Sequence, residues 1–367
     1  MHNQSELETE EDIIFQRDRA VVRILFNRPS AQNALTDAMR ETIASAIPKL
    51  ARDPDLYAVV IGTTQPDAFC VGRDVRTFAN LSRTAKDQAC AQLADEYALH
   101  WSLDCFFKPT VVLIQGAMMG SAVGLTHFCT HRVAAETYAF AMPETSFGFF
   151  PDAGTAHVLS RLPHSVGVFL ALTGRTIVAA DAYDLGLITH CIASSEFEGI
   201  VAGLADAHPI DPLLDSRHQS PGRGALASHY ECIAESFSAP TVEEVLSRLE
   251  RKRIEYHAPE WIDGVIADLS SRSPTALVIT HRHLQRCKRM SLRENLIADY
   301  KLACAMLQSN DFYEGVGAMS HDKHKPPQWA PARVADVIPE MIERFFSSTD
   351  GDAFALPSRD EMLAARV

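Results

Sequence analysis

The chain has 367 residues, of which 47% are hydrophobic and 22% are charged. This is enough apolar material for one large folded core with a smaller appended module. The net charge of -13 argues against broad binding to nucleic acids or anionic membranes, which needs a basic surface. No apolar run reaches the roughly 20 residues of a membrane helix, so we expect a soluble protein.

The eight cysteines are scattered along the chain and form no C-x-x-C pair. A chain of this length does not need disulfides, so we expect free thiols in a reducing compartment and no structural zinc. The first 18 residues are acidic, whereas mitochondrial transit peptides are rich in arginine and poor in acids. The sequence therefore shows no import signal.

The N-terminal half alternates short β-branched runs with a helical pattern. Ala20 to Phe26, Tyr57 to Gly62 and Thr110 to Ile114 are apolar runs ended by Gly, Pro or Asn, which predicts strands of a buried sheet. Between the first two, apolar residues at i, i+4 spacing predict an amphipathic helix with Asn33 or Thr36 as its N-cap. Its apolar positions are Leu35, Met39, Ile43 and Ile47.

A strand, turn and helix unit is predicted around the third strand. After Ile114 the chain passes through Gly116, Gly120 and Ser121, which indicates a turn. The apolar residues that follow predict a helix. They include Val123, Leu125 and Phe128.

The pattern changes in the second half. Residues 204–225 are rich in Pro, Asp, His, Ser and Gly, which predicts an irregular connection or an exposed insertion. Beyond them, Thr241 to Glu244 and Ser291 to Glu294 have capping-box spacing, which indicates helices. Apolar residues then recur with helical period at Leu292, Leu296, Ile297, Tyr300, Cys304 and Leu307.

These patterns divide the chain into five parts. They are an acidic N-terminal tail (1–12), a core (13–203), the irregular connection (204–225), a mainly helical region (226–346) and a loose polar tail (347–367).

Glu144 and Asp152 are the most informative residues, because they are the only charged residues in AMPETSFGFFPDAG, from Ala141 to Gly154. Carboxylates in an apolar segment carry a desolvation cost, and burial raises their pKa toward values that suit proton transfer. Each could instead cap a turn or the start of a helix. The residues alone leave both interpretations open.

Four segments in this order resemble the crotonase superfamily. They are LFNRPSAQNAL (Leu25 to Leu35), AFCVGRDV (Ala68 to Val75), GAMMGSAVGL (Gly116 to Leu125) and AMPETSFGFFPDAG. Within it the chain is similar to the 3-hydroxyisobutyryl-CoA hydrolases, through Glu144, Asp152 and the late motif DFYEGVGAMSHDKHKPPQWAP. The resemblance covers about Ile13 to Arg344. It implies an α/β fold, with a crotonase-like spiral core of strand-strand-helix units that binds acyl-CoA, followed by the mainly helical C-terminal region.

The resemblance also implies an activity and a site. The activity is hydrolysis of 3-hydroxyisobutyryl-CoA, or of a related short 3-hydroxyacyl-CoA, in valine catabolism in the mitochondrion. CoA is part of the substrate, and neither a separate cofactor nor a metal is implied. The catalytic acids correspond to Glu144 and Asp152, and the oxyanion hole to the backbone amides of Arg73 and Ser121. Substrate-binding positions are Glu96, Ser121, Glu144 and Asp152.

The proposed donors agree with elementary physics. Ser121 would begin a helix, so its N–H is an unpaired first-turn donor at the positive end of the dipole. Donors arranged in this way stabilise an oxyanion by about 3 kcal/mol each in other enzymes. The alternative for Ser121 is a plain helix cap. For Glu96, beside Asp95, it is a residue on a solvated helix face.

The chain departs from the family pattern at several positions. The family typically has Gly where Arg73, Ser121 and Ala122 stand, and one hydratase glutamate falls at Gly124, which disfavours alkene hydration. A side chain at Arg73 is compatible with a backbone donor unless the local φ and ψ demand Gly. Arg73 could narrow the acyl pocket, pair with CoA phosphates or lie exposed. Further departures are at Ser30, Thr155 and Gly317.

The sequence supports other kinds of site less well. His281 with His283, and His321 with His324, have no nearby Cys or acid in ligand spacing, so we expect surface histidines. Cys70 fits a buried thiol better than a nucleophile, and a G-x-S-x-G elbow is missing. Two alternatives stay open: a structural subunit of a mitochondrial ribosome, with the basic stretch HRHLQRCKR facing nucleic acid, and an enoyl-CoA isomerase or hydratase-type enzyme. A homo-oligomer is also left open.

Overall fold

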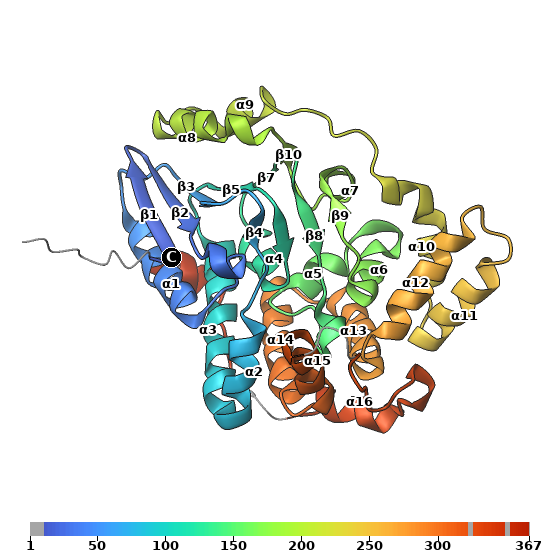
Figure 1. Cartoon of the computed structure of the whole chain (residues 1–367). Helices are drawn as coiled ribbons and strands as arrows, with labels where there is room; N and C mark the ends of the chain where they lie inside the picture. The colour runs from blue at the N-terminus through green and yellow to red at the C-terminus, as the bar shows by residue number, and fades with distance from the viewer. Residues whose placement is uncertain (1–10, 322–325, 349–352, 367) are drawn as a thin grey trace, which may run out of the picture.

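The computed structural model describes residues 11–321, 326–348 and 353–366 (Figure 1). Its main sheet has the strand order β1-β2-β3-β5-β7-β10, and a second sheet has the order β4-β6-β8-β9. The strands are β1 Ile13–Asp18, β2 Val21–Phe26, β3 Ala58–Thr63, β4 Ala68–Cys70, β5 Thr110–Ile114, β6 Ala117–Met119, β7 His131–Ala134, β8 Ala139–Ala141, β9 Ile177–Val178 and β10 His190–Cys191.

The main sheet is parallel except at its first strand. β1 pairs antiparallel with β2, and the remaining neighbours pair in parallel. The three predicted strands are confirmed as β2, β3 and β5, each within a residue of its expected ends. β1 has no sequence signal of this kind because its last four residues, Phe15 to Asp18, are exposed and carry no apolar run.

Helices link the strands of the N-terminal half. They are α1 Asp37–Arg52, α2 Val75–Thr84, α3 Lys86–Cys105, α4 Ser121–Thr126, α5 Thr155–Leu159, α6 Val166–Thr173 and α7 Ala179–Asp184. Thr36 is the N-cap of α1, since its side chain accepts from the amide of Met39 at 3.2 Å. Part of the turn predicted before Ser121 is strand β6. The helix after it ends at Thr126, before Phe128.

The C-terminal half is helical, as expected. Its helices are α8 Phe197–Ala205, α9 Ile210–Asp215, α10 Tyr230–Phe237, α11 Val242–Lys252, α12 Pro259–Ser271, α13 Pro274–Cys287, α14 Leu292–Met306, α15 Asn310–His321, α16 Pro339–Phe346 and α17 Arg359–Ala365. Thr241 caps α11, and the capping box of Ser291 and Glu294 at α14 is complete.

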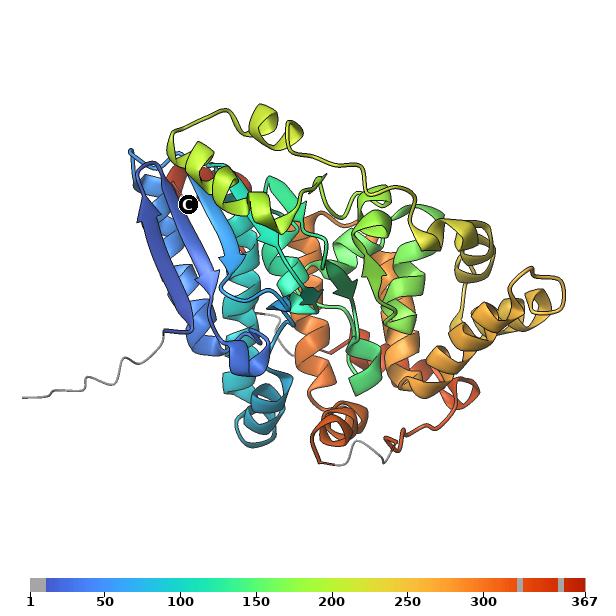
Figure 2. The ribbon, with the colours of Figure 1, turned by 45° about the horizontal axis from the view of Figure 1, so that its top comes forward.

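Two segments are more ordered than their polar sequences predict. The connection at 204–225 contains α9, whose Leu213 and Leu214 pack with α8 on one face of the main sheet (Figures 1 and 2). The tail predicted as loose contains α17. Two contacts hold the start of α17 against α3. Trp101 Nε1 donates to the carbonyl of Pro357 at 2.9 Å, and Arg359 forms an ion pair with Asp104. In both segments a few apolar side chains are buried among polar ones, and their burial is enough to order the helix.

The opposite side of the molecule positions the site. α2 and α3 share a hydrophobic cluster with α14 and α15, in which Phe78 and Leu93 meet Leu296 and Phe312. In Figure 1 the orange and red helices α14 and α15 accordingly lie beside α3 and α2. No helix among the described residues is long and apolar enough to cross a membrane.

Candidate active site

A cavity of about 710 Å³ lies between the loop after β4, the turn before α4, the segment after β8 and helix α15. Four of the five predicted site residues line it: Arg73, Ser121, Glu144 and Asp152. Residues from separate segments between positions 73 and 152 therefore line the same cavity. The apolar part of the lining includes Val71, Phe78, Met119, Phe147, Phe149 and Phe312.

The backbones before Arg73 and Ser121 lie side by side. Gly72 has a φ of +86°, and a Cβ added to it would lie 3.0 Å from the amide nitrogen of Ser121 and 2.8 Å from the carbonyl oxygen of Met119. Gly120 also has a positive φ, of +56°. These two glycines, which precede Arg73 and Ser121, are the ones that the turn geometry requires. Side chains at 73 and 121 are therefore compatible with it.

Neither amide donates a backbone hydrogen bond among the described residues. Ser121 is the first residue of α4, so its N–H has no acceptor within the helix. The amide of Leu35 donates to Gly72, and that of Asp74 donates to Leu35, at 2.8 and 3.0 Å. In this parallel bridge the N–H of Arg73 points away from Leu35.

Glu144 begins a 3-10 turn, Glu144–Phe147, directly after Pro143. A Cβ on Gly120 would lie 3.2 Å from its Oε1, so this carboxyl rests against the turn that carries Ser121. Its Oε2 is buried and has no hydrogen-bond partner in the part of the chain that the structure describes. Burial, and then the charge of Asp152, raise the pKa of Glu144 to about 8. The carboxyl is thus mostly protonated at neutral pH.

Arg73 is held between two carboxylates. Its Nε donates to Glu96 at 2.9 Å, and its Nη2 lies 2.8 Å from both Glu96 Oε2 and Asp152 Oδ2. Only 9% of Arg73 is exposed, and its guanidinium lies 4.9 Å from the centre of the Phe78 ring. Arg73 is therefore not a surface arginine, and two of its three guanidinium nitrogens are paired with carboxylates.

Glu96 supports this arrangement from behind. It is fully buried and does not line the cavity, so the structure gives no direct contact between it and a ligand there. Burial would raise its pKa, but Arg73 and Arg40 outweigh burial and lower it to about 2. Glu96 is therefore an ionised counterion of Arg73. The expected substrate contact of Glu96 stays a prediction, and the ion pairs that the structure gives it are with Arg73 and Arg40.

Asp152 receives a second donor that sequence reasoning missed. The hydroxyl of Tyr97 donates to the same Oδ2 at 2.6 Å. Burial raises the pKa of Asp152, and the positive charge of Arg73 opposes this shift. Tyr97 is the chain neighbour of Glu96, but only the packing of α3 under the loop at 152 shows its role.

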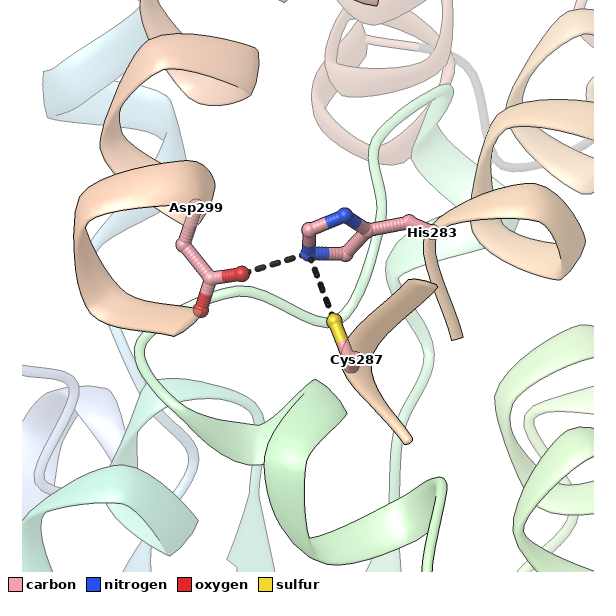
Figure 3. Close-up of side chains that lie close together, drawn as sticks. All are labelled: His283, Cys287 and Asp299. Carbon is pink, nitrogen blue, oxygen red and sulfur yellow. Dashed lines mark hydrogen bonds and ion pairs between the residues drawn. The ribbon is translucent and has the colours of Figure 1, made fainter. Parts of the chain in front are cut away.

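The loop that carries Asp152 is anchored by the C-terminal helices. Ala153 and Gly154 have positive φ, of 60° and 81°. The amide of Gly154 donates to Asp299 Oδ2 at 2.8 Å, and His283 Nε2 lies 2.6 Å from Asp299 Oδ1. Figure 3 shows His283 between Asp299 and Cys287. His283 is thus not a surface residue.

The other three histidines that we expected at the surface are His281, His321 and His324. His281 is also buried, and its Nε2 lies 3.0 Å from the carbonyl oxygen of Ala239. His324 lies outside the described residues, and the side chain of His321 is likewise not described.

The cluster in Figure 3 could also be considered as a metal site. The ligand atoms of His283, Cys287 and Asp299 lie within 4.8 Å of one another, so the acid and thiol that the sequence spacing did not show are present. Asn295 Nδ2 lies 2.9 Å from Cys287 Sγ and 3.1 Å from Asp299 Oδ1. These hydrogen bonds account for the cluster, and we assign it no ion.

Gly124 permits a close approach that no other residue would allow. A Cβ there would lie 2.1 Å from the carbonyl oxygen of Ala153 and 2.9 Å from His100 Nδ1. A glutamate at this position could not fit. Alkene hydration that uses a glutamate at this position is therefore disfavoured by packing as well as by sequence.

Residues 21–346 match the family model described as "Enoyl-CoA hydratase/isomerase". The chain belongs to this family. It is 34% identical to the "3-hydroxyisobutyryl-CoA hydrolase, mitochondrial" of Danio rerio, over 92% of this chain and 90% of the relative. The human protein of the same name is 32% identical, over 92% and 89%. "3-hydroxyisobutyryl-CoA hydrolase 1" of Arabidopsis thaliana is 31% identical, over 96% and 97%.

Solved members of the family share the whole architecture. A carnitinyl-CoA dehydratase from Mycobacterium thermoresistibile superposes with a TM-score of 0.85 at 30% identity, over 93% of this chain and 97% of that one. An enoyl-CoA hydratase from Rhodobacter sphaeroides gives 0.86 at 30% identity, over 94% and 100%. The expected crotonase fold, with its helical C-terminal region, is confirmed.

Proposed function

We propose that this chain is an acyl-CoA thioester hydrolase that converts 3-hydroxyisobutyryl-CoA, or a related short 3-hydroxyacyl-CoA, to the free acid and CoA in valine catabolism. The observation that carries the proposal is the position of Glu144. Its carboxyl has an unpartnered oxygen and rests beside the turn that presents the amide of Ser121 to the cavity. A thioester carbonyl placed there meets an acid and two N–H donors.

The amides of Arg73 and Ser121 would bind the carbonyl oxygen and stabilise the negative charge that develops on it. Glu144, once deprotonated, has two routes. In the first its oxygen bonds to the carbonyl carbon, the C–S bond breaks, CoA leaves as a thiolate that takes up a proton, and water hydrolyses the resulting anhydride. In the second Glu144 takes a proton from water, whose oxygen attacks the carbonyl carbon directly; the C–S bond then breaks, and CoA leaves as a thiolate that takes up the proton from Glu144.

Asp152 would position the reactants. Because its Oδ2 already accepts from Arg73 and Tyr97, the carboxylate is locked in one orientation at the cavity wall. From there it can accept a hydrogen bond from the attacking water or from the 3-hydroxyl of the acyl chain. Glu96 would contribute indirectly, by fixing the guanidinium of Arg73.

A mitochondrial location is part of the same proposal. The relatives from Danio rerio and Homo sapiens are named mitochondrial proteins, which supports it.

The proposal is tested on the purified full chain with a panel of acyl-CoAs. We expect thiol release from 3-hydroxyisobutyryl-CoA, measured with a thiol reagent, and no double-bond migration in enoyl-CoAs, measured by absorbance. Double-bond migration without thiol release would support the isomerase alternative instead. Cosedimentation with ribosomal particles and no turnover of any thioester would support the structural alternative.

A further inference from the structure

The guanidinium of Arg73 has one nitrogen that the carboxylates do not use. Nε and Nη2 are paired with Glu96 and Asp152. Nη1 donates to no group among the described residues, and it is not one of the fully buried nitrogens that lack a partner. Since Arg73 lines the cavity, the N–H bonds of Nη1 are the ones left for a ligand.

Asp152 offers the complementary group next to it. Its Oδ2 takes both Arg73 Nη2, at 2.8 Å, and the Tyr97 hydroxyl, at 2.6 Å. Its Oδ1 accepts from no described residue and is not sealed from the cavity. The ion pair therefore leaves one donor nitrogen and one acceptor oxygen unused, on two side chains that cannot rotate freely.

A hydroxyl group satisfies both at once, because it accepts one hydrogen bond and donates another. A 3-oxo group could accept from Arg73 but has no hydrogen to give to Asp152. A carboxylate would add a negative charge beside Asp152 and Glu144. An unsubstituted alkyl chain would leave both groups without partners in a desolvated site.

We propose that the side chain of Arg73 recognises the acyl group: Nη1 donates to the 3-hydroxyl oxygen while Asp152 accepts its hydrogen. The inference rests on the proposed thioester hydrolysis and adds a determinant of its specificity. The same residue then serves twice, since its amide faces the carbonyl oxygen and its side chain faces the hydroxyl. Arg73 stands where the family typically has Gly, so this recognition would be a property of this chain.

The test compares kcat/KM for 3-hydroxyisobutyryl-CoA and isobutyryl-CoA, which differ only in the hydroxyl, and adds methylmalonyl-CoA as the carboxylate analogue. The variants are Arg73→Gln and Arg73→Lys, with Arg23→Gln as control. Arg23 pairs with Glu198 outside the cavity. The ratio of two substrates on one preparation does not depend on the fraction that is folded. It therefore stays meaningful even though loss of a buried charge destabilises the protein.

We expect the wild type and Arg23→Gln to prefer the hydroxylated thioester by about tenfold or more, the effect of one hydrogen bond to a charged donor. In Arg73→Gln and Arg73→Lys the ratio should fall toward one. A ratio that persists in both variants, or a preference for methylmalonyl-CoA, would overturn the role of Arg73 while leaving the hydrolase proposal intact. A wild type that cleaves none of the three would remove both.

Discussion

Glu144 is the residue whose titration connects the structure with a measurable rate. Burial and the neighbouring charge of Asp152 raise its pKa to about 8 in the free protein. Either proposed route needs the carboxylate form, so the active fraction grows as the pH rises. We therefore expect log kcat/KM to rise with unit slope from pH 6 and to level off near pH 8.

This profile distinguishes a base or nucleophile from an acid. It can be measured by thiol release with a substrate concentration far below KM, because kcat/KM reports the free enzyme. A rate that falls between pH 7 and pH 9 would mean that the protonated form of Glu144 is the active one, and would exclude both routes.

The departures from Gly are also explained at this scale. The glycines that the backbone requires are Gly72 and Gly120, whose φ values are +86° and +56°, and both are retained. Arg73 and Ser121 follow them and provide N–H groups, so their side chains are free to vary. For Arg73 that freedom places a guanidinium between Glu96 and Asp152.

At the scale of elements, the loop that carries Asp152 is held by both halves of the chain. Asp152 follows the β8 segment, but the amide of Gly154 is held by Asp299 on α14, 145 residues later. The left-handed conformation of Ala153 needs such support. α14 therefore holds this loop in place.

Asp299→Ala should consequently lower kcat more than it raises KM, and should destabilise the fold by about 2–4 kcal/mol, because the Gly154 amide and His283 lose their acceptor. Steady-state kinetics and denaturant unfolding measure the two effects. Cys287→Ala is the matched control, since Cys287 belongs to the same cluster but has no contact with Gly154 in the described structure. Equal kinetic losses in both variants would contradict an anchoring role for Asp299.

At the scale of the whole molecule, the sequence predicted those elements that local residue patterns determine. β2, β3 and β5 were found because buried parallel strands are continuous apolar runs, and α1, α11 and α14 because their caps are local. β1, α9 and α17 were missed because their polar residues hide a small number of buried ones. Their order comes from docking onto the sheet and α3.

The residues of the site also fall into those that the local sequence predicts and those that it does not. Glu144 and Asp152 could be predicted because an acid in an apolar segment is visible in the sequence. The pairing of Arg73 with Glu96 and Asp152 spans 23 and 79 residues, and the support from Tyr97 and Asp299 is equally non-local. Such contacts depend on how the strands and helices assemble, so no spacing rule reveals them.

The most direct measurement is the rate of thiol release from 3-hydroxyisobutyryl-CoA by the wild type and by Glu144→Gln, with unfolding midpoints recorded for both. Gln keeps the shape of the side chain but can neither attack the carbonyl nor accept a proton from water. We expect the rate to fall by at least about 10³-fold, within the range seen when a nucleophile or general base is removed, while the variant unfolds at no lower temperature. A folded Glu144→Gln protein that releases CoA at the wild-type rate would contradict the account.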